Sequence, residues 1–192
     1  MNIRKKEVFT ISNALSFLRL LLAFPVWYSL NNFDDSFYRN FTFFLCIIAG
    51  ITDYLDGYIA RKRNEITEIG KIIDPLSDKI LVGVLALKLF LIGELSGYFL
   101  LIIVLRDIII FLGGIIISLK IKRVLPSNLL GKITVTVIGV VFLLILAGVD
   151  KTGNFFQIIY YFSIFLIYVS LIGYIIRGLE FLKKSTKNEN NK

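Results

Sequence analysis

The chain has 192 residues, of which 56% are hydrophobic, and a net charge of +8. Its mean hydropathy of +0.77 is higher than a soluble domain needs and is typical of an integral membrane protein. The absence of histidine excludes histidine-based catalysis and histidine-ligated zinc, and the basic excess indicates contact with anionic lipid, not nucleic acid.

Long runs of Leu, Ile, Val and Phe predict an all-α membrane protein and not a β-barrel, whose strands would alternate polar and apolar residues. Residues 1–12 are basic and mixed, which predicts a short interfacial helix. A bilayer core requires roughly 20 helical residues. About six segments reach that length, and we expect transmembrane helices at about 14–31, 38–62, 72–92, 97–119, 129–148 and 155–182.

Residues 1–182 are expected to form a single membrane domain, followed by a disordered polar tail over 183–192. Gly113 and Gly114 in the fourth predicted helix, and Gly139 in the fifth, would permit close packing against another helix.

The charges between the predicted helices indicate the orientation in the membrane. Basic residues gather before the first helix, in the 62–71 loop, around residues 120–123 and after residue 182. These four basic segments are the two ends of the chain and every second connection between helices. In membrane proteins, positively charged segments of this kind face the cytoplasm. We therefore expect a multi-pass protein of the cytoplasmic membrane, with both termini and the 62–71 loop in the cytoplasm.

Four aspartates flank the 62–71 loop in this otherwise apolar region. Asp53 and Asp56 are three residues apart on one predicted helix, and Asp74 and Asp78 are four apart on the next, so each pair shares a helix face. An antiparallel hairpin would bring the pairs together near the membrane surface, where four unpaired carboxylates would repel one another. A divalent cation removes that repulsion, and oxygen ligands without His or Cys suit Mg²⁺ or Mn²⁺.

Small residues and one cation accompany the aspartates. Gly57 and Ala60 leave room for a bulky ligand, and Gly70 allows a tight approach where the next helix begins. Arg61 can fork onto phosphate oxygens. The alternative is a purely structural set of salt bridges between the aspartates and nearby basic residues, namely Arg61, Lys71 and Lys79.

This spacing resembles the signature of the CDP-alcohol phosphotransferase family, Asp-x2-Asp-Gly-x2-Ala-Arg-x8-Gly-x3-Asp-x3-Asp. Every fixed position is matched, by Asp53, Asp56, Gly57, Ala60, Arg61, Gly70, Asp74 and Asp78. The segment from Ile11 to Arg19 is similar to the family's Pro-Asn-x-Leu-Thr-x-x-Arg motif, with Ser12 in place of proline and Ser16 in place of threonine. Chain length and helix number agree with the same family.

Members of this family transfer a substituted phosphate from a CDP-linked donor to an alcohol and release CMP. The resemblance implies CDP-diacylglycerol as the donor, an active site facing the cytoplasm, and a homodimer in the lipid bilayer. It also implies two ions of Mg²⁺ or Mn²⁺ held by Asp53, Asp56, Asp74 and Asp78, of which Asp78 is the general base. The implied CDP site consists of Asn13, Ser16, Asp53, Gly57, Ala60, Arg61 and Gly70.

The acceptor depends on cations outside the acidic motif. A phosphorylated acceptor needs basic partners, for which the candidates are Arg106, Lys132, Arg123 and Arg177. For Arg106, an internal pair with Asp107 is an equal alternative.

Two features of the sequence favour different acceptors. The stretch from Gly70 to Lys79 is most similar to the branch of the family that uses glycerol 3-phosphate and to its close relatives, the cardiolipin synthases. We expect glycerol 3-phosphate here because Lys132 and Arg106 supply phosphate partners. The Arg106-Asp107 pair is instead seen in the branch that uses phosphatidylglycerol. Inositol phosphate and serine are further acceptors that the same chemistry would serve.

Two other classes of protein are alternatives to an enzyme. A cation transporter or proton relay would also place carboxylates in a membrane, but such proteins often show repeats and broken helices near the midplane. A structural scaffold leaves the acidic motif unexplained.

Overall fold

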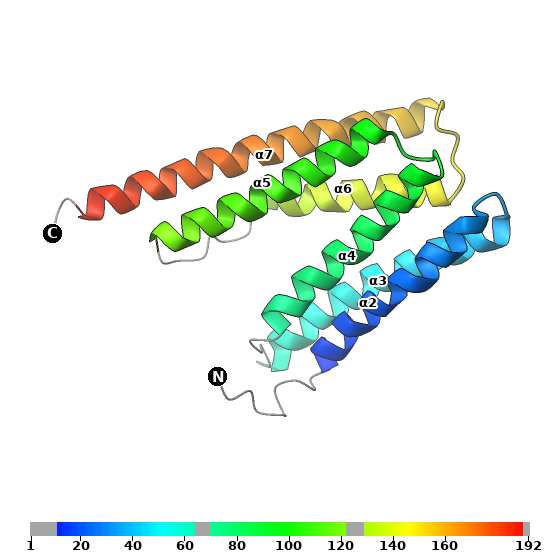
Figure 1. Cartoon of the computed structure of the whole chain (residues 1–192), viewed down its shortest axis with the longest axis horizontal. Helices are drawn as coiled ribbons and strands as arrows, with labels where there is room; N and C mark the ends of the chain where they lie inside the picture. Colours follow the sequence, from blue (N-terminus) through cyan, green and yellow to red (C-terminus); the bar gives the residue numbers. More distant parts are fainter. Residues whose placement is uncertain (1–10, 64–69, 122–128, 190–192) are drawn as a thin grey trace. The chain divides into compact units, whose positions relative to one another are not determined.

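The computed structural model describes residues 11–63, 70–121 and 129–189, and over these ranges the protein is helical without a strand (Figure 1). This confirms the predicted all-α fold class. Most of the predicted interfacial helix, residues 1–10, lies outside the described residues. The elements are α2 (Ile11–Ser29), the 3₁₀-helix η1 (Leu30–Asn32), α3 (Ser36–Arg63), α4 (Gly70–Leu91), α5 (Gly97–Ile121), α6 (Leu129–Leu146) and α7 (Asn154–Glu189).

The ends of these helices agree with the predicted ends to within a few residues, except at the C-terminus. Helix α7 continues to Glu189, past the predicted end at residue 182. The prediction of disorder from residue 183 was therefore wrong as far as residue 189. A helix that has already nucleated gains one hydrogen bond for each added residue, and the lysines of this segment are good helix formers that also suit the negative end of the helix dipole.

Four helices of the described part of the chain are long and apolar enough to cross a membrane. They are Ala14–Asn32, Gly97–Ile117, Leu129–Leu146 and Asn154–Phe181, which supports a multi-pass membrane protein. Helices α3 and α4 have sufficient length, with 28 and 22 residues, but they contain the charged residues of the acidic motif. The predicted total of six spans is not confirmed, and the orientation stays a prediction.

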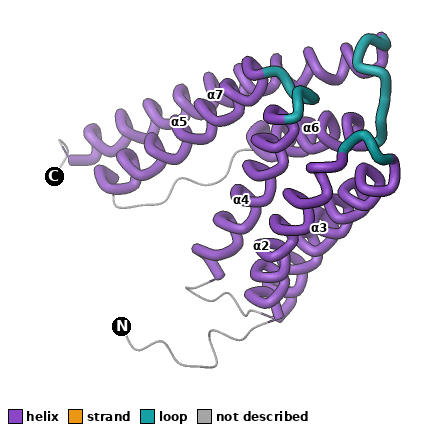
Figure 2. The backbone as a smooth tube through the Cα atoms, turned by 45° about the vertical axis from the view of Figure 1, so that its right-hand side comes forward, coloured by secondary structure: helices purple, strands orange, loops and turns teal. Residues whose placement is uncertain are grey.

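The chain divides into two compact units, and the first contains α2, α3 and α4. In this unit α2 packs against both α3 and α4 (Figure 2). Its buried residues recur every three or four positions and form one helical stripe, Ser16, Arg19, Ala23, Val26 and Ser29. Helix α4 buries a matching row with a spacing of four residues, Ser77, Leu81, Leu85 and Leu89.

Polar bonds also tie the helices of this unit together away from the acidic motif. The hydroxyls of Ser29 on α2 and Thr42 on α3 lie 2.5 Å apart and are almost fully buried. The ammonium of Lys88 on α4 donates to Asn31 at 2.5 Å and lies 4.8 Å from the ring centroid of Trp27 on α2. These bonds fix the end of the unit opposite to the acidic motif.

The second unit contains α5, α6 and α7. Helices α5 and α7 pack side by side in the same direction, with Gly113 and Gly114 against Tyr174 and Ile117 against Gly178. A Cβ atom at Gly114 would lie 2.9 Å from the Tyr174 hydroxyl, and one at Gly178 would lie 2.6 Å from Ile117 Cδ1. The prediction of close packing at Gly113 and Gly114 is thus confirmed. For Gly139 on α6 the prediction was wrong, because a Cβ atom added there would meet no atom of the described part of the chain within 4 Å.

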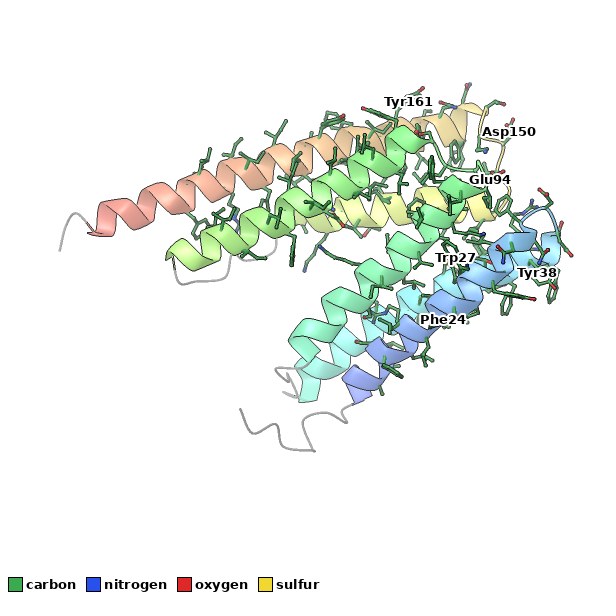
Figure 3. The ribbon with its side chains drawn as sticks, in the orientation of Figure 1. Phe24, Trp27, Tyr38, Glu94, Asp150 and Tyr161 are labelled. Carbon is green, nitrogen blue, oxygen red and sulfur yellow. The ribbon has the colours of Figure 1, made fainter. Side chains whose placement is uncertain are left out.

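Two helices end at a glycine with a left-handed backbone. Gly93 follows α4 with φ of 79°, and Gly148 follows α6 with φ of 70°. After Gly93, the Glu94 N–H donates to the Leu89 carbonyl at 2.9 Å, so a carbonyl of the last turn of α4 is satisfied. Glu94 and Asp150 lie in the loops that follow these two helix ends (Figure 3).

Candidate active site

The acidic motif lies on two helices of the first unit. Asp53 and Asp56 are in the last third of α3, and Asp74 and Asp78 are in the first half of α4. Both helices pack on α2, which carries the Asn13 to Arg19 segment. The motif and the first-helix motif therefore belong to one three-helix unit.

Only part of the motif has described side chains. Asp53 is described, whereas the side chains of the other motif residues lie outside the described ones: Asp56, Gly57, Ala60, Arg61, Gly70, Asp74 and Asp78. The same holds for Asn13. Among the described side chains there is accordingly no group of three potential metal ligands. The roles predicted for these residues stay predictions.

Asp53 forms an ion pair with an arginine from another helix. The Nη1 atom of Arg19 on α2 lies 3.1 Å from Oδ1 of Asp53 on α3. The two side chains differ sharply in exposure, 2% for Arg19 and 52% for Asp53. A guanidinium buried among apolar helices is costly unless an anion compensates its charge. Asp53 supplies that anion while its own carboxylate remains open to the surroundings.

Two serines of the same unit, one on α2 and one on α4, are also buried. Ser16 precedes Arg19 by one helical turn on the buried stripe of α2, and Ser77 lies between Asp74 and Asp78 on α4. Both have 0% exposure. Ser16, which the resemblance assigned to the CDP site, is thus enclosed by protein.

The chemistry of the donors fits a hard divalent cation. The motif offers carboxylates, the chain has no histidine, and its single cysteine, Cys46, lies two helical turns before Asp53 on α3. The exposed carboxylate of Asp53 is compatible with binding such an ion while it accepts from Arg19, because a carboxylate has two oxygens and about four acceptor sites.

Arg106 lies in the second unit and bridges all three of its helices. Its side chain on α5 is buried and donates from Nη1 to Asp107 at 2.9 Å, from Nε to Ser170 of α7 at 3.3 Å, and from Nη2 to the Gly131 carbonyl of α6 at 3.3 Å. The internal pair with Asp107, one of the two alternatives for Arg106, is therefore present. A role in acceptor binding stays a prediction.

The remaining acceptor candidates have fewer contacts. Lys132 is exposed near the start of α6, next to the Gly131 carbonyl that Arg106 binds, and Arg177 is half-buried on α7. Neither side chain forms a hydrogen bond or ion pair with another residue of the described part of the chain. Arg123 lies outside the described residues.

Arg19 is the residue that the sequence-based site missed. The predicted structural partner of Asp53 was Arg61, a near neighbour on the same helix, whereas the observed partner comes from α2. Two signals were present in the sequence. Arg19 ends the first-helix motif, and it is an arginine inside an apolar helix, the same criterion that selected Arg106.

Comparison with known proteins finds similarity over most of the chain, including the acidic motif. The family model described as CDP-alcohol phosphatidyltransferase matches residues 9–174. Three relatives named CDP-diacylglycerol–glycerol-3-phosphate 3-phosphatidyltransferase are similar to the chain. The Aquifex aeolicus protein is 28% identical over 180 residues, which cover 91% of this chain and 98% of that protein.

The two other relatives come from Rickettsia species. The Rickettsia bellii protein is 35% identical over 133 residues, covering 69% of this chain and 66% of that protein. The Rickettsia typhi protein is 33% identical over 118 residues, covering 59% of this chain and 66% of that protein. The matched region thus spans about two thirds of each of these proteins. With the family model matching from residue 9 to residue 174, the chain belongs to the CDP-alcohol phosphatidyltransferase family.

Proposed function

We propose that this protein transfers the phosphatidyl group of CDP-diacylglycerol to a hydroxyl of glycerol 3-phosphate and releases CMP. The observation that carries the proposal is the likeness to relatives named for this reaction, one of which aligns with 91% of the chain. Membership of a transferase family removes the reason to prefer a cation transporter. We place the enzyme in the cytoplasmic membrane as a homodimer, with its site open to the cytoplasm.

The acidic motif accounts for the chemistry. Asp53, Asp56, Asp74 and Asp78 would hold two ions of Mg²⁺ or Mn²⁺, which neutralise the donor diphosphate and the departing CMP. A carboxylate oxygen of Asp78 accepts the proton of the attacking hydroxyl. The hydroxyl oxygen bonds to the phosphatidyl phosphorus as the bond from that phosphorus to the CMP oxygen breaks. No covalent enzyme intermediate is required.

The remaining motif residues would bind the two substrates. We assign the CDP moiety to Asn13, Ser16, Asp53, Gly57, Ala60, Arg61 and Gly70. Glycines and an alanine let the nucleotide approach the helix backbone closely, and the guanidinium of Arg61 matches phosphate oxygens in geometry. The acceptor phosphate is assigned to the basic residues of the second half of the chain, Arg106, Arg123, Lys132 and Arg177.

One observation favours a second acceptor. Arg106 is followed by an aspartate with which it pairs at 2.9 Å, and this Arg-Asp sequence resembles the branch of the family that makes cardiolipin. Because Asp107 partly neutralises Arg106, a phosphorylated small acceptor gains less from that arginine than from an unpaired one. Phosphatidylglycerol, whose phosphate is a diester with a single negative charge, is therefore the alternative acceptor.

The test is CMP release by the purified protein with CDP-diacylglycerol, Mg²⁺ and one acceptor at a time. We expect release with glycerol 3-phosphate, and none with inositol phosphate or serine. Asp78→Asn is the matched control, which should lower release by about 10²-fold or more and leave binding of CDP-diacylglycerol intact. Release with phosphatidylglycerol alone would make the protein a cardiolipin synthase. Release that survives in Asp78→Asn would remove Asp78 as the base.

A further inference from the structure

We propose that Arg19 is a positioning residue for Asp53, which it orients for binding a divalent cation. The inference rests on the proposed function, because that function gives Asp53 its role as a metal ligand. It concerns a residue of α2, outside the acidic signature, that forms an ion pair with a signature residue.

The packing of α2 fixes the guanidinium of Arg19. Arg19 belongs to the buried stripe of α2, between Ser16 and Ala23, and it is only 2% exposed. A long side chain that is enclosed on all sides loses most of its rotamers on folding. The Nη1 atom is therefore held at a defined place between α2 and α3.

Asp53 has no comparable enclosure of its own. Its side chain is 52% exposed on α3, so packing holds its carboxylate less firmly than it holds the guanidinium of Arg19. The 3.1 Å contact from Arg19 Nη1 to Asp53 Oδ1 restricts that rotation. A carboxylate can accept this bond and also ligate a metal, and hydrogen-bond partners of metal ligands typically contribute 10–100-fold to metal affinity.

Two simpler roles for Arg19 give different expectations. If Arg19 acted only as a nearby positive charge, it would repel a cation, and its removal would strengthen metal binding. If it acted only as a tie between helices, its effect would resemble that of the Ser29–Thr42 hydroxyl pair, which joins α2 to α3 at the other end of the same unit.

The experiment measures Mn²⁺ binding to the purified full-length protein by electron paramagnetic resonance, with CMP present. Arg19→Lys keeps the charge but lacks the planar fork of the guanidinium, and Arg19→Gln removes the charge. Thr42→Val is the matched control, because it breaks the other bond between α2 and α3. The thermal midpoint Tm of each variant is measured in the same detergent.

We expect both Arg19 variants to raise the Kd for Mn²⁺ about tenfold and Thr42→Val to leave it unchanged. At saturating Mn²⁺, the KM for CDP-diacylglycerol should remain near that of the wild type in Arg19→Lys. The sign of the Arg19→Gln effect is decisive, since a lost repulsion would lower the Kd instead.

Several results would overturn the proposal. These are an unchanged Kd in Arg19→Lys, a lower Kd in Arg19→Gln, and a Kd in Thr42→Val that rises as much as in the Arg19 variants. A selective rise in KM for CDP-diacylglycerol would reassign Arg19 to the substrate. Failure of both variants to fold, or no Mn²⁺ binding by the wild type, would also refute it. Wild-type protein that binds Mn²⁺ but releases no CMP would refute the proposed function alone.

Discussion

At the scale of single residues, Arg106 holds three helices together, and its proposed role in acceptor binding depends on the N–H donors that these bonds leave over. A guanidinium has five N–H donors, and three of them bind Asp107, Ser170 and Gly131. One N–H on each Nη atom is left for an acceptor phosphate. An Arg106 that is held from three helices is also pre-oriented, which reduces the entropy lost when a phosphate binds.

This dual role leads to a prediction for Arg106→Lys. Lysine retains the charge but cannot make the three divergent bonds, so its ammonium would be poorly placed for the acceptor. We expect the KM for glycerol 3-phosphate to rise about tenfold, the loss of roughly one good hydrogen bond to a charged group. The KM for CDP-diacylglycerol should change little.

Ser170→Ala provides the control for the structural part of this effect. It removes only the partner of Arg106 Nε, which costs about 1 kcal/mol and lowers Tm by about 2–4 °C. The KM for either substrate should stay at the wild-type value. Equal increases of both KM values in Arg106→Lys would exclude Arg106 from the acceptor site.

The residues of the site were predictable to the extent that their spacing in the sequence is local. Asp53 and Asp56, or Asp74 and Asp78, lie within one or two turns of a single helix, so their common face follows from helix geometry. The pairing of Arg19 with Asp53 joins residues of two helices. It depends on how α2 docks on α3, which no local pattern specifies.

At the scale of elements, the predicted helices agree with the structure because length and local turn chemistry decide their ends. The apolar runs are long enough to nucleate helices, and glycines stop two of them: α4 before Gly93 and α6 before Gly148. Helix α7 extends past its predicted end to Glu189, although the residues of its last turns are mostly polar. A polar composition makes a segment soluble in water, but it does not end a helix when the polar residues are good helix formers.

Replacement by alanine should change Tm in opposite directions at two glycines, one inside α4 and one just after it. Gly93 has φ of 79°, where a Cβ atom costs about 1–2 kcal/mol, so Gly93→Ala should lower Tm by about 2–8 °C. Gly83 lies inside α4, and a Cβ added there meets no atom within 4 Å. Gly83→Ala should leave Tm unchanged or raise it slightly, because alanine has the higher helix propensity. The measurement is thermal unfolding in detergent, and a stable Gly93→Ala protein would contradict the assignment of this helix end.

At the scale of the whole molecule, the number of membrane crossings is the property that composition leaves open. Helices α3 and α4 have 28 and 22 residues, which is enough to cross a bilayer core, but they carry the charges of the acidic motif. These charges gather toward the 62–71 loop. From Asp53 to Arg63 the helix rises about 15 Å, which is half of a bilayer core, so the acidic end can reach the headgroup region while the apolar end crosses the rest.

The loop between α3 and α4 therefore decides between six crossings and four. Removing this hairpin from the membrane would leave both termini on the same side as before, so labelling the termini cannot distinguish the two topologies. With six crossings, the loop faces the cytoplasm, as its basic residues predict. With four, it stays outside, on the side of Glu94 and Asp150.

Cysteine labelling in whole cells tests this directly. With Cys46, the single cysteine, changed to serine, Asn64→Cys probes the loop, and Glu94→Cys and Asp150→Cys are controls for the outer side. A membrane-impermeant maleimide should label both controls and leave Asn64→Cys unmodified until the membrane is opened. Labelling of Asn64→Cys in intact cells would place the acidic motif outside, away from cytoplasmic CDP-linked donors. It would thereby refute both the orientation and a cytoplasmic active site.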